Sequence, residues 1–419
     1  MKFGLFYELQ LPAPHDDDAV TRTFAETLEH VELADRLGFD CIWATEHHFL
    51  EDHALSSAPQ VWLAAAAART QRIRIGHGIV CIPPGFAHPA RIAEQIATLD
   101  QVSGGRVEFG TGESSSRMEL EGFGVDVTTK REAYLESLEQ ICNMMTMTPY
   151  PGFEGEHFSM PCRNVVPKPA QKPHPPLWVA GKPEVAARLG MGCLGFNAVG
   201  GRQAKIMVDA YYAALQSECV PIGHAVNPNI SVLALMHCNR DADTAARNGE
   251  NLHFFGFTIA KYYLNGEVRP GRSDTWTEFA QMHGQTPPRM DADSPTNAVG
   301  TPETIRAHLR SLRDAGVDQV LFLHQGGKLD HDANCRSLEL FAAEVMPEFV
   351  EDEDRREARK AERLAPAIEA AMARKQFLPM PDDIPAVRAY GHFSHLPTAE
   401  DIALEQSTSQ DTLGALHVR

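Results

Sequence analysis

The sequence lacks any long apolar run, and its opening residues do not resemble a signal peptide. No stretch of the 419 residues approaches the roughly 20 apolar residues that a membrane-spanning helix needs. The opening MKFGLFYELQ has neither the apolar core nor the cleavage site of a secretory signal. The eight cysteines are scattered and form no C-x-x-C pair, a pattern typical of reduced thiols. We therefore expect a cytoplasmic protein.

Basic residues are too few for a protein that binds polyanions. The chain has 38 Lys and Arg against 56 Asp and Glu, and its formal net charge is −18. Nucleic acids and anionic membranes attract clustered Lys and Arg. Neither nucleic acid nor a membrane is therefore an expected partner.

Two glycine-rich nucleotide-binding motifs are also missing. The chain contains no G-x-x-x-x-G-K-[ST] and no G-x-G-x-x-G after a strand, so the sequence does not support an NTP site or a dinucleotide site of the doubly wound type. The turn after the first strand, ELQLPAPHDDD, has no glycine, whereas a doubly wound sheet usually has a glycine-rich turn there. A doubly wound sheet is therefore a weaker alternative than a closed parallel barrel.

Strand-like and helix-like segments alternate along most of the chain. Eight strand-like runs, among them FDCIWAT, IRIGHGIVCI and RVEFGTG, each lead to a segment with helical spacing. Most of these runs are continuously apolar, as expected for parallel strands whose two faces are both covered. Eight such units predict an α/β fold, a (β/α)8 TIM barrel with insertions and a C-terminal helical and irregular extension.

The domain boundaries follow from where this alternation stops. The barrel is expected to span residues 1–350, interrupted by a polar loop rich in glycine and proline at 264–299. Residues 351–419 begin with a charged helical segment and continue as a proline-rich, then polar, tail. We expect this extension to pack on the barrel or on a partner subunit.

Titratable residues cluster where the second strand ends, in the stretch ATEHHFLEDH. A metal site needs several converging ligands, and adjacent strand residues such as His47 and His48 point to opposite faces. A metal site would therefore need His77 or His324 as well. Acid–base chemistry needs only one imidazole with a carboxylate partner, and Glu119 is a candidate for that partner. A histidine held by structural hydrogen bonds is the third possibility.

Glycines and hydroxyls follow two later strands, in FGTGESSS and VAGKPE. Gly181 and Lys182 stand at the start of a predicted helix. Backbone N–H groups at a helix N-terminus bind phosphate, and a lysine adds positive charge. Either stretch alone is typical of ordinary turn glycine, but together at one end of one barrel they suggest a phosphorylated ligand.

A larger set of motifs carries a family resemblance over residues 1 to about 350. The stretches are MKFGLF, GFDCIWATEHHF, IRIGHGIVCIPPGFAHPARIAEQIATLDQVSGGRVEFGTG, PLWVAG, VGTPE and AGVDQVLF, in this order. With them the chain resembles the bacterial luciferase-like, flavin-dependent monooxygenases, among them the catalytic α subunit of bacterial luciferase.

The resemblance implies a two-component enzyme. Reduced FMN (FMNH2) and O2 would be cosubstrates, and O2 would be activated as a C4a-(hydro)peroxyflavin that oxygenates a small organic substrate, an aldehyde, a ketone or an apolar or terpenoid compound. A separate NAD(P)H:flavin reductase would supply the FMNH2. The loop at 264–299 falls where the family has a mobile lid. A homodimer through the helices after the second and third strands is expected by analogy.

The resemblance also assigns site residues. His47, the first histidine of the EHH motif, would be the catalytic acid or base, and Glu119 would pair with it. The flavin ring would lie against a bulged third strand at Gly78 and Ile79, where an unusual cis peptide bond is expected. No metal is implied.

The chain departs from the family after the fourth strand. Luciferase has a reactive cysteine where this chain has Gly112, and Glu113 replaces an arginine that commonly contacts phosphate. An acidic group would repel phosphate, so phosphate binding must depend on other groups. The residues expected to bind the cofactor are Glu46, Gly78, Ile79, Gly112, Ser114, Ser115, Arg131, Ala180, Gly181 and Lys182.

Three competing functions stay open. The same barrel in an F420-dependent oxidoreductase would use a deazaflavin instead of FMN. A metal-dependent hydrolase would use His47, His77 and His324. A non-catalytic partner subunit is the third alternative, and the retention of His47 argues against it.

Overall fold

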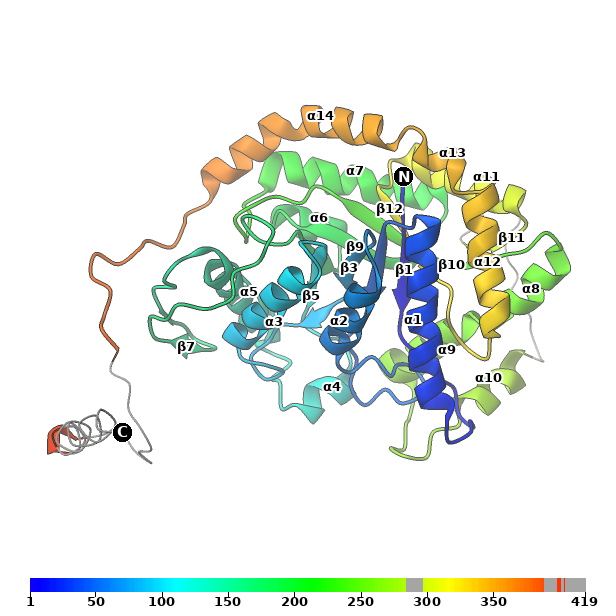
Figure 1. Cartoon of the computed structure of the whole chain (residues 1–419), viewed down its shortest axis with the longest axis horizontal. Coiled ribbons are helices and arrows are strands. Elements are labelled where there is room, and N and C mark those ends of the chain that lie inside the picture. Colours follow the sequence, from blue (N-terminus) through cyan, green and yellow to red (C-terminus); the bar gives the residue numbers. More distant parts are fainter. Residues whose placement is uncertain (284–296, 388–397, 401–402, 404–419) are drawn as a thin grey trace, which may run out of the picture. The chain divides into compact units, whose positions relative to one another are not determined.

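The structure, a computed structural model, describes residues 1–283, 297–387, 398–400 and 403. Its centre is a closed barrel of eight parallel strands surrounded by helices (Figure 1), which confirms the fold predicted from the sequence. In hydrogen-bonded order, the barrel strands are β1 (Lys2–Tyr7), β2 (Cys41–Ala44), β3 (Arg74–His77), β5 (Val107–Gly112), β8 (Leu177–Ala180), β9 (Gly192–Ala198), β10 (Ile230–Cys238) and β12 (Gln319–Leu323), and β12 pairs with β1.

Short strands modify this barrel at its edges. The third strand breaks after β3 and resumes as β4 (Val80–Cys81), which also pairs with β5. The strand β11 (Ala298–Gly300) pairs in parallel with the end of β10, and β6 (Phe153–Glu154) and β7 (Ser159–Met160) form an antiparallel hairpin. The break between β3 and β4 falls at Gly78 and Ile79, the two residues where the family resemblance implied a bulge.

Helices surround the barrel and cover its two ends. They are α1 (Ala19–Leu37), α2 (Pro59–Arg69), α3 (Pro89–Val102), α4 (Arg117–Gly122), α5 (Lys130–Thr146), α6 (Pro183–Arg188), α7 (Gly201–Glu218), α8 (Ala242–Glu250), α9 (His253–Ile259), the π-helix η1 (Ala260–Asn265), α10 (Thr275–His283), α11 (Pro302–Ala315), α12 (His331–Glu344), α13 (Pro347–Val350) and α14 (Glu353–Arg374).

The ends of α11 show how the local sequence sets a helix. Thr301 caps its N-terminus by accepting a hydrogen bond from the backbone N–H of Thr304, and Pro302 occupies the first helical position, where the missing N–H costs nothing. Gly316 ends the helix at φ 93°, a left-handed conformation that suits glycine.

Alternate residues of each strand pack in two separate layers. In β2, Ile42 and Ala44 join the large apolar cluster beneath the surrounding helices, whereas Cys41 and Trp43 join a second cluster inside the barrel. The ring of Trp43 packs edge-on against Trp178 at 5.3 Å. Large side chains therefore fill the barrel interior, and the space for a ligand lies above them, at the carboxyl ends of the strands.

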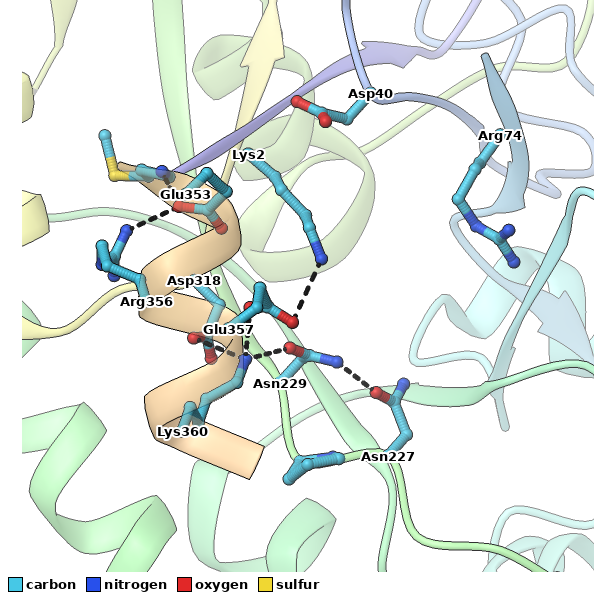
Figure 2. A network of polar contacts seen from close by, with 12 residues as sticks. Lys2, Asp40, Arg74, Asn227, Asn229, Asp318, Glu353, Arg356, Glu357 and Lys360 are labelled. Atoms are coloured by element: carbon cyan, nitrogen blue, oxygen red, sulfur yellow. Dashed lines mark hydrogen bonds and ion pairs between the residues drawn. The ribbon is translucent and has the colours of Figure 1, made fainter. Parts of the chain in front are cut away.

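The opposite end of the barrel is covered by α14, which lies along α7 (Figure 1). Figure 2 shows the polar network that holds it there. The Nζ atom of Lys360 lies 2.9 Å from Oδ1 of Asp318 and 2.6 Å from Oδ1 of Asn229, and Lys2 pairs with Glu357 at 3.4 Å. The first part of the expected C-terminal extension therefore packs on the barrel.

The remainder of that extension belongs to a second unit. The chain divides into two compact units, residues 1–379 and 380–419. Part of the second unit lies outside the described residues, and so does 284–296 of the expected lid loop. None of the described helices is both long and apolar enough to span a membrane.

Candidate functional site

A cavity of about 410 Å³ opens at the carboxyl ends of the barrel strands. This is the end at which TIM barrels place their active sites, and the volume is in the usual range for a small-molecule site. Its walls come from the segments after β1, β2, β3 and β5 and from α9 and η1. The lining residues are Phe6, Glu8, Thr45, Glu46, His47, Gly78, Ile79, Cys81, Gly112, Glu113, Ser114, Ser115, Glu119, Lys130, Ala180, Phe196, Phe255, Ile259 and Tyr263.

Most of the site residues expected from the sequence meet in this cavity. The lining includes His47, Glu119, Glu46, Gly78, Ile79, Gly112, Ser114, Ser115 and Ala180. Three expected residues, Arg131, Gly181 and Lys182, are not among the lining residues. Arg131 instead lies with its guanidinium 3.6 Å from Glu113, and the neighbouring Lys130 reaches the cavity, where its ammonium donates to the backbone carbonyl of Ser114.

His47 and Glu119 form the central pair. The Nδ1 atom of His47 lies 2.9 Å from Oε1 of Glu119, which also accepts a hydrogen bond from the backbone N–H of His48 at 2.9 Å. The other carboxylate oxygen accepts from the hydroxyl of Ser114 at 2.5 Å. Burial raises the pKa of Glu119, but the hydrogen bond and charge of His47 and the hydroxyl of Ser114 outweigh it and lower the pKa. Glu119 is therefore a buried carboxylate that fixes the orientation of His47.

Glu8 places a second carboxylate against the same imidazole. Its side chain is only 2% exposed, its Oε2 atom lies 3.5 Å from Nε2 of His47, and it accepts a hydrogen bond from Thr45 at 2.6 Å. Burial raises the pKa of Glu8, although the charge of His47 and the hydroxyl of Thr45 oppose this. Burial lowers the pKa of His47, but Glu8 and Glu119 together outweigh it and raise that pKa above its usual value. The two carboxylates therefore favour the protonated form of the imidazole.

Two further polar residues, Tyr263 and His53, lie beside the ring of His47, and Tyr263 also lines the cavity. The hydroxyl of Tyr263 lies 3.0 Å from Nδ1 and 3.5 Å from Nε2 of His47. His53 is buried, and its Nδ1 atom lies 2.8 Å from the hydroxyl of Thr258. Burial raises the pKa of Tyr263, so its hydroxyl stays protonated at neutral pH. Sequence reasoning did not assign Tyr263, which lies on the π-helix η1, because no motif marks that segment.

The opposite wall of the cavity is apolar. Phe6 packs against Phe196 with ring centroids 5.2 Å apart and against Phe255 at 6.4 Å. Gly78 lies against Phe6, because a Cβ atom at this glycine would stand 3.2 Å from the phenyl ring. Gly112 lies closer still to Ile79, whose Cδ1 atom would be 2.6 Å from an added Cβ. The missing side chains let Phe6 and Ile79 pack directly against the backbone at this wall.

One expected backbone feature is wrong. Among the described residues, cis peptide bonds occur only before proline, at Pro14, Pro149, Pro167 and Pro173. The peptide between Gly78 and Ile79 is therefore trans. The irregularity of the third strand comes from the gap between β3 and β4, where the chain leaves the regular sheet.

The histidines expected to complete a metal site lie elsewhere. Burial lowers the pKa of both His77 and His324 to about 4, and Nδ1 of His324 donates a 3.0 Å hydrogen bond to Oδ1 of Asn334. Within the described part of the chain, the group near the cavity that brings three ligand atoms within 4.8 Å of one another is Glu8, His47 and His53. The hydrolase set of His47, His77 and His324 is not assembled.

By sequence, the chain is similar to luciferase-like and flavin-dependent monooxygenases. A family profile described as luciferase-like monooxygenase matches residues 1–319. The oxygenase component of the flavin-dependent trigonelline monooxygenase of Acinetobacter baylyi is 27% identical over 373 residues, which cover 85% of this chain and 98% of that protein. An uncharacterised protein of Sinorhizobium fredii, y4wF, is 35% identical over 187 residues, 44% of this chain and 52% of that protein.

Solved structures show the same fold. The monooxygenase RslO1 from Streptomyces bottropensis matches with a TM-score of 0.68 and 25% identity, covering 84% of this chain and 100% of that one. The oxygenating constituent of 3,6-diketocamphane monooxygenase from Pseudomonas putida, in complex with FMN, matches with a TM-score of 0.64 and 19% identity. The match covers 84% of this chain and 99% of that one. The F420-dependent tetrahydromethanopterin reductase from Methanopyrus kandleri matches with a TM-score of 0.60 and 20% identity. The match covers 83% of this chain and 99% of that one.

Proposed function

This chain belongs to the luciferase-like monooxygenase family, and we propose that it is the oxygenase component of a two-component system that uses FMNH2 and O2. A separate NAD(P)H:flavin reductase would supply the FMNH2, and a small organic molecule would be the substrate. The observation that carries this proposal is the pairing of His47 with Glu119 across the cavity from the apolar wall at Gly78. Proton-handling groups thus face the place where a flat ring fits.

The residues present fit a flavin mononucleotide. The flat wall at Gly78 and Ile79 suits an isoalloxazine ring, and one buried carboxylate oxygen of Glu113 has no hydrogen-bond partner among the described residues. A ribityl hydroxyl would satisfy that oxygen, since an unpaired buried acceptor is costly. Arg131 partly neutralises Glu113, which reduces the repulsion of a phosphate. Lys130 and the hydroxyl of Ser115 would then hold the phosphate.

His47 would manage protons in this site. Bound FMNH2 supplies the two electrons that reduce one oxygen atom of O2 to water while the other atom enters the substrate. Glu8 and Glu119 favour the protonated imidazole, so His47 can donate a proton to the oxygen atom that leaves as water. Tyr263 covers the same imidazole and helps to exclude bulk water, which the chemistry requires. Phe6, Phe196 and Phe255 would contact an apolar part of the substrate.

The test combines cofactor binding with product analysis. FMN and F420 are titrated separately against the purified protein, and photoreduced FMN is then mixed with O2 and a panel of aldehydes, ketones and terpenes, with no other protein present. The proposal expects FMN to bind more tightly than F420 and at least one substrate to gain an oxygen atom. Preference for F420 without oxygenation would establish the dehydrogenase or reductase alternative. Flavin binding without turnover of any panel member would favour the partner-subunit alternative.

A homodimer through α2 and α3 is part of the same proposal. The outer face of α2 carries Val61 at 72% exposure and small side chains, and α3 exposes Val102. Small residues let helices approach closely. Light scattering should report a dimer for the native chain and a monomer for Val61→Lys, because a buried lysine without a partner charge is destabilising. A native monomer would contradict this assignment.

A further inference from the structure

A cluster of metal-binding side chains lies on the outside of the barrel, between α1 and α12. We propose that His30, His331 and Cys335 bind a Zn²⁺ ion. One ligand atom from each of the three residues lies within 4.8 Å of the other two. Nothing in the proposed oxygenase chemistry uses these residues, and none of them lines the cavity that contains His47.

The helix α12 supplies two of the ligands in a favourable spacing. His331 and Cys335 are four residues apart and therefore lie on the same face of the helix. The Nε2 atom of His331 is 3.7 Å from the sulfur of Cys335. Zinc–nitrogen and zinc–sulfur bonds of about 2.0 and 2.3 Å at a tetrahedral angle separate the two ligand atoms by roughly 3.5 Å. The observed separation is close to this value.

His30 on α1 supplies the third ligand atom. Its buried imidazole, unpartnered in the described part of the chain, is also an independent sign that an ion binds here. Its side chain is 2% exposed, and within the described residues neither ring nitrogen makes a hydrogen bond of good geometry. A buried imidazole without partners loses its hydration without compensation. The His30 and His331 rings are stacked, with centroids 4.8 Å apart and 16° between their planes, so one ring must rotate for a nitrogen of each to point at the same ion.

The surroundings provide a fourth ligand and an entry path. The Oε2 atom of Glu29, an exposed residue next to His30, lies 3.3 Å from Nε2 of His331. A carboxylate or a water molecule at this position would complete a tetrahedral set. A separate cavity of about 290 Å³ is lined by both His30 and His331, so an ion from solvent can reach the cluster.

The donor set selects the metal. Two imidazoles and one thiolate suit zinc, whereas magnesium and calcium prefer all-oxygen sites. The ion would join α1, which follows the first barrel strand, to α12, which follows the last. Such a link ties together segments far apart in the sequence at the place where the barrel closes. Its expected role is therefore structural.

The experiment measures zinc in the full-length chain after treatment with a chelator. Titration calorimetry with ZnCl2 and elemental analysis after gel filtration should give one tightly bound ion per chain. The ion should raise the melting temperature by roughly 2 °C or more, because it binds only the folded state. Cys335→Ser and His331→Asn should each lower the zinc affinity at least tenfold and abolish the rise. Cys162→Ser, at the other partly exposed cysteine, is the matched control and should keep both the zinc affinity and the rise in melting temperature.

Cobalt gives a readout that does not depend on stability. Co²⁺ in the same site should show a thiolate charge-transfer absorption in the native chain and in Cys162→Ser, and this absorption should be missing in Cys335→Ser. The proposal is wrong if the native chain binds no zinc after dialysis. It is also wrong if Cys335→Ser retains the bound ion while His53→Asn loses it, because the ion would then occupy the group at Glu8, His47 and His53.

Discussion

The imidazole of His47 and the carboxylate of Glu119 are 2.9 Å apart, although the residues are separated by 72 positions in the sequence. His47 follows β2, and Glu119 lies in the first turn of α4, after β5. Parallel strands of a barrel end at the same rim, so residues that follow different strands meet there. The pair is thus a direct consequence of the fold, and the proposed chemistry depends on it.

Replacing His47 by Asn should separate flavin binding from oxygenation. The variant loses the proton donor but keeps a polar side chain of similar size, so FMN affinity should change by less than about threefold. Oxygenated product should fall by roughly 100-fold, the usual contribution of general acid–base catalysis, and H2O2 should account for most of the O2 consumed. His48→Asn is the matched control, because His48 contacts Glu46 rather than Glu119 through its ring. Equal product from both variants would remove His47 from the mechanism.

The proposed proton donor also sets a pH dependence. Glu8 and Glu119 raise the pKa of His47 above that of a free imidazole, so the protonated form is fully present at low pH and is lost as the pH rises through the raised pKa. Coupling of O2 consumption to product should therefore decline on the alkaline side. In Glu119→Gln the pKa of His47 should fall, and this alkaline limb should move to lower pH. A pH profile of product per O2 consumed checks the direction, and an unmoved limb would show that another group controls it.

Tyr263 offers a test of a residue that no sequence motif marks. Tyr263→Phe removes a hydroxyl 3.0 Å from the Nδ1 atom of His47 and leaves the ring in place. We expect roughly a tenfold loss of coupling with FMN affinity unchanged, since a hydrogen bond to a charged group contributes about 1.5–3 kcal/mol. Tyr262→Phe is the control on the same π-helix, because that hydroxyl faces Ser273 at 3.4 Å. A comparable loss in Tyr262→Phe would indicate damage to the helix instead.

The wall at Gly112 should be sensitive to a single methyl group. An alanine Cβ there would stand 2.6 Å from Cδ1 of Ile79, so Ile79 must move into the cavity. Overpacking of this kind costs about 1–3 kcal/mol, and FMN affinity should fall by roughly tenfold. Gly256→Ala in α9 is the control, because a Cβ there meets nothing within 4 Å. Fluorescence titration with FMN measures both variants, and equal affinities would mean that the ring binds elsewhere.

How much of this site the sequence predicts depends on whether a residue stands at a strand end. His47, Gly78 and Gly112 do, and the alternation of strands and helices is enough to bring them to one rim of the barrel. Tyr263 does not, because its position depends on how η1 folds back over the barrel mouth, which no local pattern encodes. The sequence also does not show which of two neighbouring side chains in α5 enters the cavity. Arg131 is the expected residue there, but Lys130 lines the cavity and Arg131 pairs with Glu113.

The contact of α14 with the barrel can be tested at a largely buried ion pair, Lys360 with Asp318. The side chains of Lys360 and Asp318 are 11% and 6% exposed, and their charges are 2.9 Å apart. In Lys360→Met, the Asp318 carboxylate keeps its hydrogen bonds from Tyr212 and the backbone of Ile230 but loses its counter-charge. Removing one partner of a buried ion pair destabilises the fold by more than the pair's net contribution to stability, because the other charge stays buried without a partner. With two hydrogen bonds retained, we expect a loss on the order of 2–3 kcal/mol and a clearly lower melting temperature.

The matched control for this change is Lys205→Met. Lys205 pairs with Asp209 on the surface of α7, where the two side chains are 54% and 62% exposed, and such pairs contribute little. Its melting temperature should stay close to that of the native chain. Product formation by folded Lys360→Met should also be unchanged, because the pair lies at the amino-terminal end of the strands and the cavity at the carboxyl end. If Lys360→Met melted at the same temperature as Lys205→Met, the contact of α14 with the barrel would not contribute to stability.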